Sequence, residues 1–579
     1  MSPATAPGLA PRPLRLLPAL TLIWLLALAL ALVGLGQLPL RDWDEGIVAR
    51  VALETSLAPW PAKLLPTYWG DAYLNKPPAI HLLIAACIGL WRAIGQLPPA
   101  SLPPEWVVRL GPALVSSMLP PLLGLVQLRL WPAQRLAAIA SAAIALTLMP
   151  LVRHGRLAML DSSQLVALAL LWWALLAAHS GQRPLLLHGA LAGLATSLLL
   201  LLKAPAALPL VLAALALRWL DRDLGWRCWS LLLLGLALGL LPGLAWHGLH
   251  GFVRGPGALL MWTSQGYARV GAAIEGHAGG PGPPLLEVLK GGWPWLPLWP
   301  FGLALAWRLR QQRWGRWVLG LSLSAAALVL PLRTQLPWYS LLLWPPFCLA
   351  CGPVLAWLSQ PDGMPRPPAA ALAVAIPRAW AALGALLLAA IPPVAAGWLP
   401  LPAATLPLLL SLGFGLLVGG LLLLRRAPEL RLAAAGLLLA GVALTLALLM
   451  AGPLWLWELN ESWPVPPVAA LLRRIEASQG AKPQLWHEAE RPSLNWYAGR
   501  RLRALDDDAA AATATATAAA GHSPTLPSDR PPAGLQAAGP AGRDVGDGLL
   551  LLARQAPELV GLRCTWIDQA GGLGLYHCR

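Results

Sequence analysis

The sequence predicts an α-helical polytopic membrane protein with about thirteen transmembrane helices and a small α/β soluble domain at its C-terminal end. Of its 579 residues, 57% are hydrophobic and only 12% are charged, whereas soluble domains contain about 25% charged residues. The mean hydropathy is +0.61. The apolar runs are rich in Leu and Ala, have membrane-spanning length and are separated by short Arg-bearing loops. Outer-membrane strands would be about ten residues long and would alternate, so the pattern indicates a helical bundle.

The first apolar run extends from about residue 14 to 38 and is too long for the core of a signal peptide, so we expect a retained helix. Arg12 and Arg15 precede it and place the N-terminus in the cytoplasm. The following segment, 39–106, is then an outer-face loop. Within it, the apolar run 80–96 begins after two prolines and is short, and we expect it to lie along the membrane interface.

The number of spans follows from the charge of the loops. If 80–96 crossed the membrane, the chain would have fourteen spans and its arginine-rich loops would lie outside. With thirteen spans these loops lie inside, as the positive-inside rule requires. The predicted spans are 14–38, 107–130, 136–152, 163–180, 185–202, 204–220, 229–249, 294–308, 317–332, 337–357, 379–398, 403–424 and 432–452.

Residues 1–453 therefore form a predicted transmembrane domain, with a second outer-face loop at 250–293. This loop is long and rich in Gly and Pro; it is either a lid over a cavity or a plain connector. After residue 453 the charge rises and no span follows, so residues 454–579 are predicted to form a soluble domain on the periplasmic side. Residues 506–543 are of low complexity and are expected to be a disordered insertion.

The net charge of +16 does not indicate a nucleic-acid partner, because most arginines occupy the loops that set membrane orientation. Four cysteines lie in apolar segments and are interpreted as packing residues: Cys87, Cys228, Cys348 and Cys351. The C-x-x-C spacing of the last two lacks a redox context. Cys564 and Cys578 could form a disulfide if the C-terminal end faces an oxidising compartment.

Three polar islands interrupt this apolar chain, and charges gathered at one face of a bundle point to chemistry on a charged, lipid-linked substrate. The first contains Asp44 and Glu45, directly after the first span. Acidic residues favour helix N-termini, so capping of the following helix is one interpretation. The other is a catalytic carboxylate that removes a proton from an acceptor hydroxyl.

Two lysines are candidate ligands for a phosphate. Lys76 lies in the second polar island, residues 73–78, and precedes two prolines that fix the direction of its ammonium group. A single lysine at a helix end, however, often only extends its side chain to the membrane interface. Lys203 interrupts a run of leucines and is followed by Ala-Pro. In the thirteen-span topology it reaches the outer face, where a cation beside a cavity suits a phosphate.

The third island contains Arg153, Arg156 and Asp161. These residues could form a boundary ion pair, but outer-face arginines depart from the positive-inside rule and favour a role in the site. Arg333, Trp338 and Tyr339 fall at another outer boundary. The two aromatic residues could equally belong to an interfacial belt.

The islands together resemble the ArnT-like and protein O-mannosyltransferase group (glycosyltransferase family 39), and most closely the bacterial aminoarabinose transferases. The resemblance rests on Asp44-Glu45, Tyr73-x-x-Lys76-Pro-Pro, Arg-Leu-Ala-Met-Leu-Asp161, Lys203-x-Pro and Leu-Pro-Trp338-Tyr339, in this order, and on Glu490-Arg-Pro-Ser-Leu494 in the outer domain. It covers essentially the whole chain except 506–543. Where relatives often have Ser-Lys-Leu-Pro, this chain has Thr-Gln-Leu-Pro, so Arg333 replaces the missing cation or the donor preference differs.

The resemblance implies the GT-C fold and a polyprenyl-phosphate-linked sugar as donor, with lipid A modification among the implied processes. It implies Asp44 as the catalytic carboxylate with Glu45 beside it, and Asp161 as a second acidic residue. Lys76, Lys203 and one of Arg153 and Arg156 would bind the donor phosphate, and Tyr73, Trp338 and Tyr339 would line the site. The acceptor, whether lipid, glycan or protein, is left open.

We therefore expect a glycosyltransferase in the bacterial plasma membrane; the alternative is a transporter or lipid flippase. Transporters tend to show internal repeats and broken helices near the membrane centre, whereas this chain shows no repeat and its charges gather at one face. No cofactor is certain. A divalent metal between Asp44 and Asp161 is compatible with the residues, but no His/Cys cluster requires one.

Overall fold

The structure is a computed structural model that describes residues 16–41, 43–99, 101–179, 184–272, 280–455, 465–479, 485–487, 490–504, 549–553, 564–570 and 573–578. The chain divides into two compact units. The first comprises Met1–Gly36, Thr55–Thr67 and Ala72–Leu456, and the second comprises Gln37–Glu54, Tyr68–Asp71 and Trp457–Arg579. Arg12, Arg15 and the predicted insertion 506–543 lie outside the described residues.

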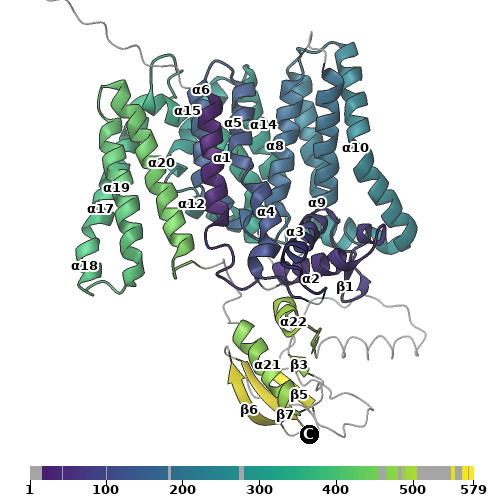
Figure 1. Cartoon of the computed structure of the whole chain (residues 1–579). Coiled ribbons are helices and arrows are strands. Elements are labelled where there is room, and N and C mark those ends of the chain that lie inside the picture. Colours follow the sequence, from purple (N-terminus) through teal and green to yellow (C-terminus); the bar gives the residue numbers. More distant parts are fainter. Residues whose placement is uncertain are drawn as a thin grey trace, which may run out of the picture. The chain divides into compact units, whose positions relative to one another are not determined.

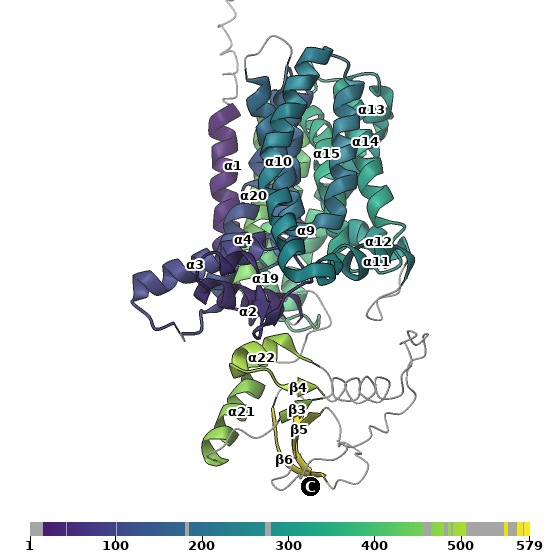
Figure 2. The same ribbon diagram turned by 90° about the vertical axis from the view of Figure 1, so that its right-hand side faces the viewer.

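The first unit is a bundle of apolar helices (Figures 1 and 2). Its long helices are α1 (Leu16–Leu32), α4 (Glu105–Ser116), α5 (Leu119–Leu130), α6 (Arg135–Thr147), α8 (Asp161–Ala177), α9 (Leu185–Leu220), α10 (Trp226–Arg254), α13 (Trp299–Arg308), α14 (Arg313–Val329), α15 (Trp344–Ser359), α17 (Ala375–Ala389), α19 (Leu406–Leu423) and α20 (Pro428–Ala451). Shorter helices are α7 (Met149–Gly155), α16 (Ala370–Ala373) and α18 (Ile391–Ala395).

The described helices confirm a multi-pass membrane protein. Seven are long and apolar enough to cross a membrane, or eight if α6 and α7, which meet at 62°, form one bent span. Three further apolar helices are shorter: α1, α8 and α3 (Ala79–Gly95). The number of thirteen crossings remains a prediction.

Helix α9 contains 36 residues but does not run straight, because Lys203 in its middle has a non-helical backbone (φ −148°, ψ 78°). His188 near its start contacts Trp173 in the last turns of α8, and Arg218 near its end donates to the carbonyls of Leu175 and Ala178. Lys203 instead contacts Asp161 at the beginning of α8. Both ends of α9 therefore lie beside one end of α8, and the chain reverses at Lys203, as expected from the separate predicted spans 185–202 and 204–220.

Proline explains the break. Pro205 has no N–H to donate to the preceding turn and its ring clashes with that turn, whereas proline is tolerated in the first turn of a helix, so the second half of α9 begins directly after Lys203. The helix cannot continue unbroken through this position, and Lys203 is left at the turn between the two halves.

The first half of α9 packs against α10 with almost no space between the backbones. A Cβ atom on Gly193 would lie 2.1 Å from the Leu236 carbonyl oxygen, and one on Gly239 would lie 2.1 Å from the Ala190 carbonyl oxygen. Each helix carries two such glycines four residues apart, which is the small-residue spacing that allows close helix packing in membranes.

The position of helix α3 supports the prediction that residues 80–96 lie along the membrane interface. Figure 2 shows it running across the direction of the long helices at one end of the bundle. Ile80, Ile84 and Ile88 are buried against the unit, whereas Leu90 and Ile94 on the same helix are 60% and 77% exposed. A helix with apolar residues left outside at the bundle end suits the boundary between lipid and water.

The opposite end of α8 carries an ion-pair cluster. Asp221 is fully buried and pairs with Arg313 (3.2 Å) and Arg316 (2.6 Å), and Asp223 pairs with Arg313 (2.5 Å) and with Arg218. Burial opposes ionisation of Asp223, but its hydrogen bonds with Arg218 and Arg313 and their charges lower its pKa. This cluster fixes the α9–α10 loop against α14, at the end of α8 that lies away from Lys203.

The segment predicted as an outer loop at 250–293 has ordered structure on both sides of residues 273–279, which lie outside the described part. It forms short helices at Gly255–Leu259, Thr263–Tyr267, Ala268–Gly271 (α11) and Gly282–Gly291 (α12). Further short helices occur at Ala62–Leu64, Leu296–Leu298, Pro337–Leu343 and Ala403–Thr405.

The second unit contains the predicted α/β domain. Its five-stranded sheet has the order β4-β3-β5-β7-β6, with β3 parallel to β4 and β5 and with β7 antiparallel to β5 and β6. The strands are β3 (Leu485–His487), β4 (Arg503–Ala504), β5 (Leu549–Ala553), β6 (Cys564–Ala570) and β7 (Leu573–Cys578). Helix α21 (Val465–Gln479) and helix α22 (Pro492–Ala498) supply Leu472 and Leu494 to a core that includes Leu575.

Two observations in this unit bear on the predictions. The backbone of Cys564 lies opposite that of Cys578 in the β6–β7 register, so the pairing of these cysteines remains an open prediction. Residues 37–54, which the sequence assigned to the transmembrane domain, pack with the C-terminal domain instead. They include most of α2 (Asp44–Leu57), and residues 68–71, from the short strands β1 (Thr67–Tyr68) and β2 (Asp71–Ala72), belong to the same unit.

Candidate active site

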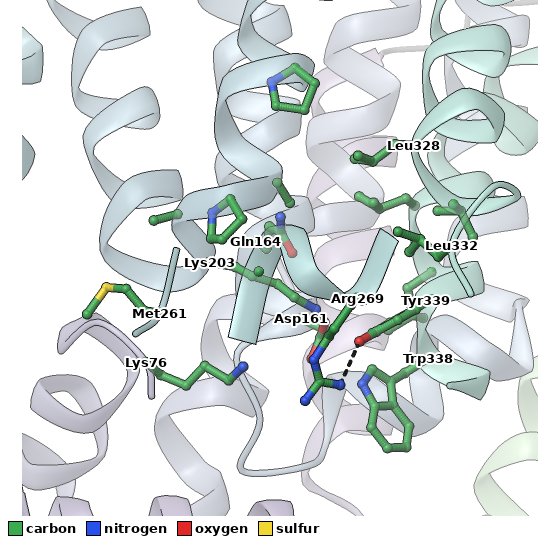
Figure 3. A pocket seen from close by; sticks show the side chains of 18 of the residues that line it. Lys76, Asp161, Gln164, Lys203, Met261, Arg269, Leu328, Leu332, Trp338 and Tyr339 are labelled. Atoms are coloured by element: carbon green, nitrogen blue, oxygen red, sulfur yellow. Dashed lines mark hydrogen bonds and ion pairs between the residues drawn. The ribbon is translucent and has the colours of Figure 1, made fainter. Parts of the chain in front are cut away.

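A cavity of about 150 Å³ lies in the first unit, where α8 begins and α9 reverses. Its walls are largely apolar, with Leu165, Pro209, Leu328 and Leu332 among the lining residues. Four charged side chains line it: Lys76, Asp161, Lys203 and Arg269. Figure 3 shows the charged groups of these residues directed toward one part of the cavity.

Asp161 and Lys203 form an ion pair at this end of the bundle. Lys203 Nζ lies 2.8 Å from Asp161 Oδ1, and the two side chains are 22% and 10% exposed. Asp161 occupies the first turn of α8, where the helix dipole favours a negative charge. Because Lys203 stands at the reversal of α9, its long side chain can reach that helix start.

Tyr339 joins two cations of the site. Its hydroxyl group is 3.2 Å from Arg269 Nη1, and the Lys203 ammonium lies 4.9 Å from the centre of its ring. Arg269 belongs to α11 and is only 8% exposed. The hydrogen bond and the cation–π contact hold both positive groups beside the same aromatic ring.

The remaining wall comes from two segments named in the sequence analysis. Lys76 lies between Asn75 and Pro77, which also line the cavity, and precedes the start of α3. Trp338, next to Tyr339, lies in the short helix Pro337–Leu343 and contacts the Tyr339 ring at 6.5 Å between ring centres. Segments far apart in the sequence thus contribute to one site.

The charges of the cavity suit an anion. Three cations face one carboxylate, and the walls are otherwise mainly apolar, so the electrostatic attraction for a bound anion is stronger than it would be in water. Arginine and lysine beside a hydroxyl group are typical ligands of a phosphate. An apolar cavity that ends in such a group suits an amphipathic ligand with an anionic head.

Arg156, predicted to bind phosphate, has another role in the structure. It is fully buried and donates to the carbonyls of Leu30 (2.7 Å) and Val33, which are left without helical partners at the C-terminal end of α1. Its guanidinium also lies 5.5 Å from the ring centre of Trp455, which Arg153 approaches at 5.7 Å. Neither arginine lines the cavity, so the geometry does not support their assignment to the donor phosphate.

Arg333 and Tyr73 are also not among the lining residues. Arg333 is exposed, and Tyr73 is buried with its ring edge against His81 at 5.3 Å between ring centres. The cation that occupies the site in addition to the two predicted lysines is Arg269. Sequence reasoning did not single it out, because it lies in a loop without periodicity; the length of that loop was the available signal.

Asp44 and Glu45 belong to the second unit and begin helix α2. Glu45 is fully buried, and its Oε2 accepts a hydrogen bond of 2.7 Å from the Arg41 backbone N–H. It therefore closes the turn that precedes α2, which is the capping role considered above. Asp44 is half-buried at the first position of the helix. Asp42 lies outside the described residues.

The described residues contain no group of three or more His, Cys, Asp and Glu side chains placed to hold a metal ion. Cys348 and Cys351 are buried on α15 and are free, in agreement with a packing role.

Comparisons with known proteins agree with the predicted resemblance. Residues 67–247 match the family model described as "Dolichyl-phosphate-mannose-protein mannosyltransferase". This region contains Lys76, Asp161 and Lys203, but not Arg269 or Tyr339. A search of curated protein sequences gives no match.

Solved structures of ArnT from Cupriavidus metallidurans match the chain over nearly its whole length. The apo structure has 17% sequence identity and a TM-score of 0.66, with coverage of 97% of this chain and 98% of ArnT. The structure bound to undecaprenyl phosphate has 17% identity and a TM-score of 0.64, with coverage of 96% and 97%. The chain therefore has the ArnT fold, and its residues 67–247 match the dolichyl-phosphate-mannose-protein mannosyltransferase family.

Proposed function

We propose that this protein is an integral-membrane glycosyltransferase that moves a sugar from a polyprenyl-phosphate donor to an acceptor on the outer face of the membrane. The observation that carries the proposal is the cavity, in which Lys203, Arg269 and Lys76 converge at one end of an otherwise largely apolar space. ArnT, which has the same fold, was crystallised with undecaprenyl phosphate. A polyprenyl phosphate combines an apolar chain with an anionic head, and the cavity offers an apolar wall and a cluster of cations to match them.

The proposed reaction is a displacement at the anomeric carbon of the donor sugar. An acceptor oxygen forms a bond to this carbon, the bond to the phosphate oxygen breaks, and the polyprenyl phosphate leaves with the electron pair. Lys76, Lys203 and Arg269 stabilise the charge that accumulates on the leaving phosphate, and the mainly apolar walls strengthen this effect. Tyr339 holds Arg269 in place through its hydroxyl group.

We assign Asp44 the role of general base because the resemblance of the Asp44-Glu45 motif implies it; Asp44 is not among the residues that line the cavity. When the acceptor is a hydroxyl, its carboxylate receives the proton as the new bond forms. We assign Asp161 a different role, since its ion pair with Lys203 positions that cation. We assign Glu45 a structural role, because its carboxylate accepts the Arg41 N–H in the turn before α2.

We propose the bacterial plasma membrane as the location, with the cavity at the periplasmic side. The support comes from α8, which has the cavity at its first residue and the Arg218 cluster at its other end. Arginine-rich loops favour the cytoplasm, so the cavity end faces outward. The C-terminal domain follows the thirteenth predicted span, which ends outside, so we propose that it is periplasmic as well. The acceptor is a lipid, a glycan or a protein; lipid A is the lipid acceptor that similarity to ArnT favours.

Purified protein, supplied with polyprenyl-phosphate donors that carry different sugars and with a membrane extract as acceptor source, tests this function. We expect release of free polyprenyl phosphate from at least one donor. Asp44→Asn should lower kcat by roughly 10²- to 10⁴-fold, the usual contribution of general base catalysis. Lys203→Met and Arg269→Met should lower kcat/KM for the donor, because each removes a group that binds the phosphate and stabilises its charge as it leaves.

Matched controls separate chemistry from folding. Asp568→Asn changes a partly exposed carboxylate on β6, and Lys290→Met changes an exposed lysine at the end of α12, so both should retain activity. Absence of release from every donor by folded wild-type protein would contradict the proposed function and favour a transporter. Full activity of Asp44→Asn would remove Asp44 from the mechanism.

A further inference from the structure

Most of helix α2 (residues 44–54) and the C-terminal domain are parts of one compact unit, although more than 400 residues separate them in sequence. Asp44 is the first residue of this helix. The contacts that hold α2 therefore determine where the proposed general base lies. They are concentrated at its two ends.

The start of α2 rests directly on the backbone of α22. A Cβ atom on Gly46 would lie 2.5 Å from the Ser493 backbone nitrogen, 2.6 Å from the Pro492 carbonyl carbon and 2.9 Å from the Ser493 Cα. These neighbours are backbone atoms, so they cannot move aside as a flexible side chain would. Only glycine permits this approach, two residues after Asp44.

A hydrogen bond fixes the chain just before α2. The Leu40 backbone N–H donates to the Tyr497 hydroxyl oxygen at 2.8 Å, and Tyr497 is a residue of α22. Together with Gly46, this bond places α22 against both sides of the turn that carries Asp44. The buried Glu45 carboxylate, bonded to the Arg41 N–H, stiffens the same turn.

The later part of α2 is connected to the C-terminal domain through the turn at 68–71. The Glu54 carboxylate accepts hydrogen bonds from the Trp69 N–H (2.8 Å) and the Gly70 N–H (3.2 Å). On the other side of this turn, the Tyr68 hydroxyl donates to Glu490 Oε1 at 3.1 Å, and Arg501 Nε lies 3.3 Å from the same oxygen.

Tyr68 keeps its proton in this arrangement. Burial first, and then the negative charge of Glu490, raise the pKa of the Tyr68 hydroxyl above its ordinary value. The hydroxyl therefore remains a donor to Glu490 at neutral pH.

We infer that the C-terminal domain is the positioning element for α2, and that Gly46 and Tyr497 are positioning residues for Asp44. The inference rests on the proposed function for the role of Asp44, but the contacts themselves do not depend on it. The inference also gives a role to the Glu490–Leu494 motif. This stretch contains the start of α22 and the backbone atoms that contact Gly46 of α2. Donor binding by the cavity cations is a separate task.

Two variants test the inference in the full-length protein. Gly46→Ala should displace α2 and lower kcat by about 10²-fold, as expected when a catalytic group is moved by about 1 Å. Tyr497→Phe removes the hydrogen bond to the Leu40 N–H and should lower kcat by roughly threefold to tenfold. The KM for the donor should stay within about twofold of wild type in both variants, because their cavity ligands are intact.

Hydrogen exchange gives a second readout that needs no activity. Amides of α2 should exchange faster in both variants, while those of α8 stay as in wild type. Arg474→Gln is the control, because it changes an exposed residue of α21 whose ion pair with Asp568 spans 3.8 Å. It should affect neither kcat nor the exchange of α2.

The outcomes are distinguishable. Wild-type kcat together with unchanged α2 exchange in Tyr497→Phe and Gly46→Ala would overturn the inference, as would equal losses in Arg474→Gln. If Gly46→Ala does not fold, Tyr497→Phe decides alone. If the wild-type protein releases no polyprenyl phosphate, the proposed function fails, and the exchange measurements still decide whether α22 holds α2.

Discussion

Gln164 is a polar residue of the cavity wall that the mechanism above does not use. It lies one turn after Asp161 on α8 and is only 2% exposed. Its Nε2 has no hydrogen-bond partner among the described residues. A buried amide donor without a partner costs about 1–3 kcal/mol. Figure 3 shows its amide among the cavity side chains, where a bound ligand can accept a hydrogen bond from it.

We expect Gln164→Leu to have two opposite effects. The protein should become more stable, because an unpaired amide is replaced by an apolar group of similar size. The KM for the donor should rise by roughly threefold to tenfold, because one ligand hydrogen bond is lost. Thermal unfolding in detergent and donor titration measure the two effects.

Ser163→Ala on the same helix is the matched control for this change. The Ser163 hydroxyl is also buried without a partner in the described structure, but Ser163 does not line the cavity. It should leave the KM unchanged. An unaltered KM in Gln164→Leu would exclude Gln164 from donor binding.

At the scale of single residues, the sequence identified those whose neighbours in the chain are unusual. Lys203 could be predicted because it interrupts a run of leucines beside a proline, and Asp161 because it adjoins an outer boundary. The contacts of Arg156 could not be predicted, since Leu30 and Val33 lie more than 120 residues before it. Arg269 was missed for the same reason: its neighbour Tyr339 is 70 residues away.

At the scale of elements, the packing of α9 against α10 depends on glycines, which have no side chain to keep the two backbones apart. Gly193 and Gly239 each face a carbonyl oxygen of the other helix at a distance that a Cβ atom cannot occupy. In a membrane, such close backbone packing replaces the hydrophobic effect as the source of helix association. The pair also fixes the first half of α9, which ends at Lys203.

Gly193→Ala and Gly239→Ala should therefore each destabilise the protein, by about 1–3 kcal/mol as typical for overpacking. Gly248→Ala on α10 is the control, because a Cβ atom there meets no neighbour within 4 Å. Since alanine favours a helix over glycine, this control should be neutral or slightly stabilising. Thermal unfolding in detergent compares the three variants. Equal stability of all three variants would show that the close packing at Gly193 and Gly239 does not stabilise the protein.

Helix positions were accessible to prediction because apolar runs of membrane length report burial in lipid, whatever the tertiary contacts are. The separate runs 185–202 and 204–220 were predicted correctly on this basis, including the reversal between them. The assignment of residues 37–54 was different, because tertiary contacts such as that between Gly46 and α22 connect them to the C-terminal domain. A sequence pattern carries no information about such distant pairs.

For the whole molecule, the orientation in the membrane is the main prediction left to test. Single cysteines at Gly225, in the α9–α10 loop, and at Gly280, before α12, should react from opposite sides. We expect Gly225→Cys to be labelled only from the cytoplasm and Gly280→Cys only from the periplasm, in a background without the native cysteines. Neither position has a neighbour within 4 Å of a new Cβ atom, so the substitutions should be tolerated. Labelling of both from one side would refute the thirteen-span topology.

The ion pair between Asp161 and Lys203 keeps a mostly buried ammonium compensated at the cavity. The carboxylate lies 2.8 Å from the ammonium, and both side chains have little exposure. A lysine ammonium has three N–H groups, so Lys203 can donate to a bound phosphate and still keep its bond to Asp161. The ammonium would then stay fixed in the site both when the phosphate arrives and when it leaves.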